Sequence, residues 1–231
     1  MTKRYAIYYA PARDSAWWDF GSRWLGRDEW SGAQLPRSTL TQLIPGEFDR
    51  ITAEPGRYGF HATLKAPFRL RDGVAEAALL GRVRQLAQSR RPVPLETLVP
   101  VLMDGFVALV PAVRNPALGA LAEVCVTELD DLRAPLTKAE IEKRQPDQLD
   151  ARSRALLDRF GYHLVLERFR FHMTLTGRVD TALAGQVVAR IARPVAQLNL
   201  QEPPFLDRLC VFAEPRPGAP FLRIADALLL P

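Results

Sequence analysis

A short motif that occurs twice constrains the fold of this chain more than any other feature. The pattern His-x-Thr-Leu stands at residues 61–64 and again at residues 172–175, and a phenylalanine precedes it each time. The chain has 3 histidines, so the motif accounts for all but one of them. A motif that recurs together with its surroundings indicates a duplicated structural unit.

The same order of predicted elements follows both copies of the motif. Each copy lies in an apolar and β-branched segment that predicts a strand, and an amphipathic helix and two further strands come next. The helices are expected over residues 74–88 and 181–192, and the strands over residues 94–102, 106–113, 206–213 and 221–229. The sequence therefore predicts an α+β fold that is bilobal and duplicated, in which each lobe is an antiparallel sheet with helices on its outer face and a cleft lies between the lobes.

This pattern predicts a single two-lobed domain over residues 1–231. The repeat units are expected at about residues 56–131 and 167–231. A charged segment with two prolines, residues 133–150, connects them and predicts short helical pieces. Hydrophobic residues make up 48% of the chain, which is enough apolar material for a packed core.

The charge and the distribution of apolar residues limit the classes of function. The net charge of +5 suits anionic ligands, but it is equally compatible with a solvated basic surface. No segment approaches the roughly 18 apolar residues of a membrane span, and the apolar start of the chain is too short for a signal peptide. We therefore expect a cytoplasmic protein with no membrane contact and no obligate protein partner.

Neither a metal nor a cofactor is expected. Cys125 and Cys210 lack the paired spacing of zinc ligands, and their apolar neighbours predict buried, reduced thiols. The third histidine, His163, has no carboxylate at ligand spacing with which to complete a metal site.

The two motifs supply the side chains of an acid–base pair. Residues i and i+2 of a strand point to the same face, so His61 shares a face with Thr63, and His172 shares one with Thr174. Hydrolysis of a phosphodiester needs a base that activates water and an acid that protonates the leaving oxygen, and imidazole can serve as either near neutral pH. Threonine hydroxyls can donate to the non-bridging oxygens. These four residues are the candidate catalytic group, the alternative being two structural histidines that share a motif by chance.

Four more residues are candidates for substrate binding. Strand parity places Lys65 on the face of the first motif histidine, and Thr176 and Arg178 on the face of the second. The alternative interpretation of these residues is a purely structural role, or a solvated position at the rim of the site. Tyr58 is out of parity with the first motif and is expected to pack against the cleft or close it.

The segments around the motifs resemble the two-histidine (2H) phosphoesterase superfamily. Residues 58–68 read YGFHATLKAPF and residues 169–177 read FRFHMTLTG. The superfamily includes RNA 2′,3′-cyclic phosphodiesterases, and these segments are most similar to the branch found with bacterial phosphonate-utilisation genes. The resemblance spans nearly the whole chain. It implies a bilobal α+β fold, a site without metal, and catalytic roles for the motif histidines and threonines.

Three functions are compatible with these features. The first is a metal-independent phosphodiesterase that opens a cyclic phosphodiester on a small ribose phosphate in phosphonate catabolism, with 5-phosphoribosyl 1,2-cyclic phosphate as the expected substrate. The second is an RNA 2′,3′-cyclic phosphodiesterase that acts on RNA ends. The third is a non-catalytic nucleotide- or RNA-binding module. The intact histidine pair argues against this third function, because binding alone needs no pair of imidazoles. No long basic stripe is apparent, which favours a small phosphorylated substrate over RNA.

Overall fold

One antiparallel sheet forms the centre of the fold. The computed structural model describes residues 3–40 and 47–230, and within them the 7 strands of this sheet follow the order β4-β5-β6-β2-β1-β8-β9. The strands are β1 (Arg4–Tyr9), β2 (Ala62–Phe68), β4 (Leu98–Met103), β5 (Phe106–Pro111), β6 (Met173–Thr174), β8 (Arg208–Glu214) and β9 (Leu222–Leu228). A second sheet pairs β3 (Val93–Pro94) with β7 (Phe205–Leu206).

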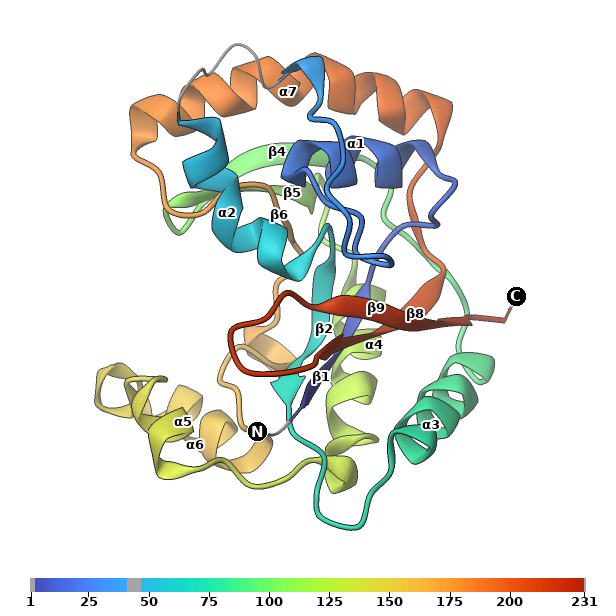
Figure 1. The fold of residues 1–231 in the computed structure, drawn as a ribbon, viewed down its shortest axis with the longest axis vertical. Helices are drawn as coiled ribbons and strands as arrows, with labels where there is room; N and C mark the ends of the chain where they lie inside the picture. The colour runs from blue at the N-terminus through green and yellow to red at the C-terminus, as the bar shows by residue number, and fades with distance from the viewer. Residues whose placement is uncertain (1–2, 41–46, 231) are drawn as a thin grey trace.

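Helices pack on both ends of this sheet. They are α1 (Ala16–Leu25), α2 (Phe48–Tyr58), α3 (Glu76–Gln88), α4 (Pro116–Thr127), α5 (Lys138–Glu142), α6 (Ala151–Phe160) and α7 (Thr181–Gln201), with short 3₁₀ turns η2 (Asp130–Leu132), η3 (Pro146–Gln148) and η4 (Leu166–Arg168). Figure 1 shows α1, α2 and α7 at one end of the molecule and α3 to α6 at the other. Helix α7 contacts β4 and β5, whereas α3 contacts β8 and β9.

The two sequence repeats have the same element order, but they are interleaved. The first runs β2, α3, β4, β5 and the second β6, α7, β8, β9. The hairpin of the first repeat pairs with β6 of the second, and β2 pairs with β6 through Ala62 and Met173. The prediction of antiparallel sheets with helices is confirmed. The prediction that each lobe has its own sheet does not hold, because the two motif strands pair with each other and join both repeats.

The ends of the helices follow from local capping. Ser15 accepts a hydrogen bond from the N–H of Trp18 at the start of α1, and Gly26 ends that helix with a φ of 72°. Asn115 caps α4 with a proline directly after it. Along α1, Trp17 and Trp24 are buried and pack in the core.

The second motif strand is shorter than predicted. The alternating segment from residue 169 to residue 177 forms only the two-residue strand β6. After Thr174 the amides of Leu175 and Thr176 both donate to the carbonyl of Val107, at 2.9 and 3.2 Å. Two consecutive amides that share one acceptor break the regular ladder, so the strand ends there. Over the described residues, no helix has both the length and the apolar character needed to cross a membrane.

Candidate active site

All four motif side chains line one pocket. His61, Thr63, His172 and Thr174 contribute to the wall of a cavity of about 630 Å³. The rest of the wall comes from β1, the end of α2, β2, Phe106 of β5, residues 176–178 after β6, and the segment between the two repeats. The sequence prediction that the two motifs meet at one site agrees with this arrangement.

The pairing of β2 with β6 explains why the motifs meet. Ala62 and Met173 are partners in an antiparallel pair. The positions on either side therefore face each other, so His61 lies across from Thr174, and Thr63 lies across from His172. Directly opposite residues of a sheet have Cβ atoms about 5 Å apart. Each histidine thus has two threonines beside it, one from its own motif and one from the other.

Both imidazoles are held by the same local hydrogen bond. The Nδ1 atom of His61 lies 2.8 Å from the carbonyl oxygen of Gly59, and Nδ1 of His172 lies 2.8 Å from the carbonyl oxygen of Arg170. A carbonyl only accepts, so Nδ1 carries the proton in both rings and Nε2 is left for chemistry. The Nε2 atom of His61 is 3.3 Å from Oγ1 of Thr63.

Burial makes both imidazoles less basic than a free histidine. It lowers the pKa of His61 to about 4, an effect that the Gly59 carbonyl opposes and the neighbouring His172 reinforces. Burial also lowers the pKa of His172, against the opposing effect of the Arg170 carbonyl. Both rings are therefore mainly neutral at pH 7, and an anion bound between them would raise both pKa values.

Aromatic side chains fix the planes of the two imidazoles. The ring of Tyr8, from β1, stacks on His61 with centroids 3.8 Å apart and an interplanar angle of 24°. Phe106, from β5, lies beside His172 with centroids 5.7 Å apart. Both aromatic residues also line the pocket. Their contacts preorganise the acid–base pair.

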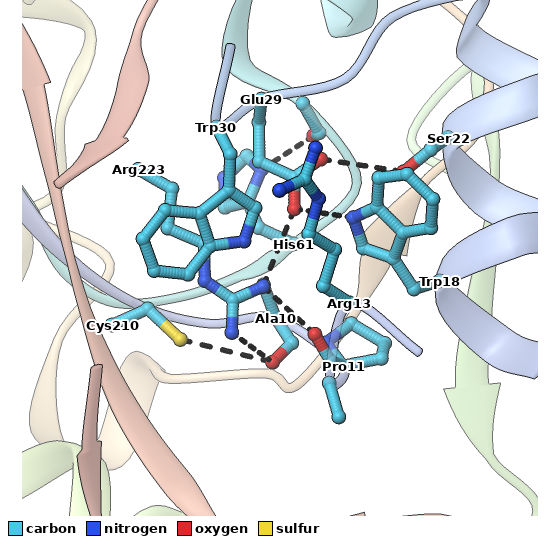
Figure 2. A network of polar contacts seen from close by, with 12 residues as sticks. Ala10, Pro11, Arg13, Trp18, Ser22, Glu29, Trp30, His61, Cys210 and Arg223 are labelled. Atoms are coloured by element: carbon cyan, nitrogen blue, oxygen red, sulfur yellow. Dashed lines mark hydrogen bonds and ion pairs between the residues drawn. The ribbon is translucent and has the colours of Figure 1, made fainter. Parts of the chain in front are cut away.

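A buried polar network around Glu29 and Arg223 lies close to His61 (Figure 2). Glu29 and Arg223 both have fully buried side chains and form an ion pair at 3.3 Å. Trp18 donates its indole N–H to Glu29 at 2.8 Å. The loop that precedes His61 touches this network at Gly59, where an added Cβ would lie 2.9 Å from Cβ of Glu29. The backbone at Gly59, whose carbonyl orients His61, therefore packs closely against Glu29.

Substitution of Gly59 by alanine is predicted to lower activity. Gly59 has a φ of 83°, which is strained for any other residue, and a side chain there meets Glu29. We expect kcat/KM to fall by about 10²-fold, because small misplacements of a reacting group have effects of that order. Gly73→Ala is the matched control, since Gly73 has a φ of 82° but nothing within 4 Å. Equal activity of the two variants would contradict the role assigned to this loop.

Lys65 does not line this pocket. Its side chain is buried, and Nζ lies 3.0 Å from the carboxylate of Asp130. Between Thr63 and Lys65 the paired positions advance two residues along β2 but only one along β1, which is a β-bulge. The bulge reverses the alternation, so Ala66 faces the pocket instead. The prediction from strand parity that Lys65 binds substrate is therefore wrong. Lys65 instead forms a buried ion pair with Asp130.

The other three predicted binding residues do line the pocket. Thr176 is fully buried, and its hydroxyl accepts the N–H of Val107 at 2.9 Å, which ties up part of its hydrogen-bonding capacity. Arg178 is exposed and forms no ion pair with any carboxylate of the described residues. The hydroxyl of Tyr58 accepts a hydrogen bond from Arg57 at 3.1 Å.

Several pocket residues were not predicted from the sequence. Tyr8 comes from β1, Lys143 and Arg144 come from the connector between the repeats, and Tyr162 follows α6. The charge of the connector is visible in the sequence, but its position against the motifs depends on tertiary packing. In the described part of the chain, no group of three or more His, Cys, Asp or Glu side chains is arranged to hold a metal ion. Cys125 and Cys210 are free and buried, as predicted.

These features define a class of site: two equivalent histidine–threonine pairs at the meeting point of two interleaved repeats. The family described as "Protein of unknown function (DUF1045)" matches residues 63–222, and the chain belongs to this family. The matched region includes the whole second motif and most of the pocket wall.

Two curated relatives carry the name ribose 1,5-bisphosphate phosphokinase PhnN. The protein from Janthinobacterium sp. (strain Marseille) is 41% identical over 229 residues, which cover 95% of this chain and 49% of that protein. The protein from Laribacter hongkongensis (strain HLHK9) is 37% identical over 220 residues, which cover 94% of this chain and 50% of that protein. Both relatives are named as enzymes, and the chain spans about half of their length.

Proposed function

We propose that this pocket hydrolyses a cyclic phosphodiester on a small ribose phosphate, without a metal ion. The observation that carries the proposal is the equivalence of the two histidines. Each donates Nδ1–H to a carbonyl two residues before it, and both line one pocket. This is the arrangement expected of a general base and a general acid on either side of a phosphate, and it agrees with the resemblance to the 2H phosphoesterases.

We assign the role of base to His61 and the role of acid to His172. His61, whose pKa is lowered to about 4, is neutral over the whole physiological range and acts as the base. Its Nε2 takes a proton from water as the water oxygen bonds to phosphorus. His172 enters the step protonated and gives its Nε2 proton to the leaving oxygen as the P–O bond breaks. The products are a phosphomonoester and a free hydroxyl, while Thr63 and Thr174 donate to the non-bridging oxygens.

The size of the pocket supports a small substrate. Its volume of about 630 Å³ falls within the range of pockets that enclose one small molecule. The cationic residues of the site lie within this pocket and its rim. An RNA end with a 2′,3′-cyclic phosphate remains the second candidate substrate, and the same mechanism would apply to it.

The name of the relatives bears on the substrate. The loop G-x-x-x-x-G-K-[ST] cradles the nucleotide phosphates in P-loop kinases, and this sequence has no Gly-Lys pair. We assign the kinase reaction in those proteins to the half that this chain does not match. The half that it does match then carries a separate reaction on a related sugar phosphate.

Ribose 1,5-bisphosphate, the compound in the name of both relatives, indicates the direction of ring opening. If the substrate is 5-phosphoribosyl 1,2-cyclic phosphate, departure of the 2-oxygen leaves the phosphate on carbon 1 and yields ribose 1,5-bisphosphate. The two halves of the relatives would then catalyse consecutive steps. The resemblance to the phosphonate-associated branch assigns these steps to phosphonate catabolism.

A comparison of two substrates tests this proposal. We expect a higher kcat/KM for 5-phosphoribosyl 1,2-cyclic phosphate than for an oligonucleotide that ends in a 2′,3′-cyclic phosphate, and no effect of EDTA on either rate. Faster turnover of the oligonucleotide, with a steep dependence on salt, would transfer the assignment to RNA ends. Loss of activity in EDTA that a divalent ion restores would overturn the metal-independent mechanism.

A further inference from the structure

The pocket has a group of polar side chains that the acid–base step does not use. Tyr8 lies on β1, Lys143 and Arg144 belong to the connector between the repeats, and Tyr162 follows α6. None of the four belongs to either motif. Their presence in the same cavity requires an explanation other than proton transfer.

Tyr8 has an unused hydroxyl although its side chain is buried. Only 1% of Tyr8 is exposed, its ring stacks on His61, and it lines the pocket. Among the described residues, its hydroxyl has no hydrogen-bond partner. Burial raises the pKa of Tyr8 well above its usual range, and the neighbouring hydroxyls of Tyr58 and Tyr162 add to the rise. This hydroxyl is therefore always protonated and can donate into the pocket.

The connector adds positive charge that no carboxylate neutralises. The guanidinium of Arg144 lies 4.8 Å from the centre of the Tyr162 ring. Within residues 3–40 and 47–230, neither Lys143 nor Arg144 forms an ion pair. Arg4 and Arg57, which line the same pocket, differ in that both bind Glu214. Arg178, after the second motif, also lacks an ion pair among the described residues, so Lys143 and Arg144 are the free cations that the connector contributes to the pocket.

Among the described residues, two carboxylates line the pocket, those of Glu140 and Glu54, and that of Glu140 is already engaged. Glu140 is bound by Arg69 at 3.0 Å and by the N–H of Thr137 at 2.8 Å. Glu54 lies beside Gly177, on the stretch that follows the second motif. The region around Tyr8 and Arg144 is therefore a favourable environment for a second negative group.

We propose that Tyr8, Tyr162, Lys143 and Arg144 form a second anion subsite, which binds a phosphate monoester of the substrate away from the phosphorus that reacts. This inference rests on the proposed function for the identity of the reacting group. Two hydroxyl donors and two free cations match the oxygens and the double charge of a phosphate monoester. Binding energy from this remote phosphate would be used to position the cyclic phosphate between the histidines.

Binding of ribose 5-phosphate, with ribose as the reference, tests the subsite without any catalysis. The titration is done by calorimetry on His172→Ala protein, which weakens phosphate binding at the reacting position but keeps the stacking of Tyr8 on His61. We expect Tyr8→Phe, which keeps the ring, and Arg144→Ala each to weaken binding of ribose 5-phosphate by about 10–100-fold. Arg144→Lys should recover part of the loss, because it restores the charge.

Matched controls lie on the same segment but outside the pocket. Lys138→Ala, on α5, and Arg154→Ala, on α6, each remove one positive charge without touching the pocket lining, and we expect unchanged binding. Unchanged binding in Tyr8→Phe and Arg144→Ala would overturn the subsite, as would an equal loss in the controls.

The subsite and the proposed function can fail separately. If no cyclic phosphate is hydrolysed but ribose 5-phosphate binding depends on Tyr8 and Arg144, the subsite stands and the reaction is wrong. If hydrolysis occurs and Arg144→Ala lowers kcat/KM equally for cyclic substrates with and without the second phosphate, the reaction stands and the subsite is wrong. The proposal predicts a selective loss of about 10–100-fold for the substrate that carries the second phosphate.

Discussion

Alanine in place of His61 or His172 lowers kcat by about 10²–10⁴-fold, the usual effect of removing a general acid or base. The loss should be similar for the two variants, because each removes one half of the same proton transfer. His163→Ala is the control, since His163 is the third histidine of the chain and does not line the pocket. Steady-state rates on the cyclic substrate measure the effect. A variant of either motif histidine with wild-type kcat would remove that residue from the mechanism.

The pH profile of the wild-type protein gives a second readout of the same pair. His61 has to be neutral, which holds above its pKa of about 4. His172 has to be protonated, which holds below its pKa, itself lowered by burial below the usual value near 6.5. Thus kcat/KM should be highest at mildly acidic pH, falling as the pH rises through the pKa of His172 and also as it falls through about 4. An optimum on the alkaline side of neutrality would contradict this assignment.

Methionine in place of Arg223 lowers the free energy of unfolding by about 3–5 kcal/mol. Arg223 and Glu29 are both fully buried, so the variant leaves a buried carboxylate without its cation. Urea denaturation measures the loss. Arg154→Ala, which breaks an exposed pair with Asp147, should cost less than about 1 kcal/mol. The double variant Glu29→Gln with Arg223→Met should be more stable than Arg223→Met alone, because it no longer buries an unpaired charge.

The candidate catalytic group could be predicted from the sequence because two local rules were sufficient. Strand parity fixes which face Thr63 shares with His61, and the repeated motif indicates that a second such pair meets the first. What the sequence does not contain is the partner of each strand. Ala62 pairs with Met173, so the two repeats share a sheet and do not form separate ones.

The binding residues were harder to predict, for two physical reasons. A β-bulge between Thr63 and Lys65 leaves no mark in the residue pattern, yet it turns Lys65 away from the pocket and into contact with Asp130. Tyr8 and Arg144 reach the pocket from β1 and from the connector. Their positions depend on strand order and on the packing of the connector, neither of which local periodicity encodes.

One measurement tests the central claim most directly: phosphorus NMR of 5-phosphoribosyl 1,2-cyclic phosphate incubated with the protein in water enriched in heavy oxygen. Wild-type protein should replace the cyclic phosphodiester signal by that of a phosphomonoester on carbon 1 that carries one heavy oxygen, in the presence of EDTA. The double variant His61→Ala with His172→Ala should leave the cyclic signal unchanged. Intact cyclic phosphate after incubation with the wild-type protein, or equal turnover by the double variant, would contradict a phosphodiesterase built on this histidine pair.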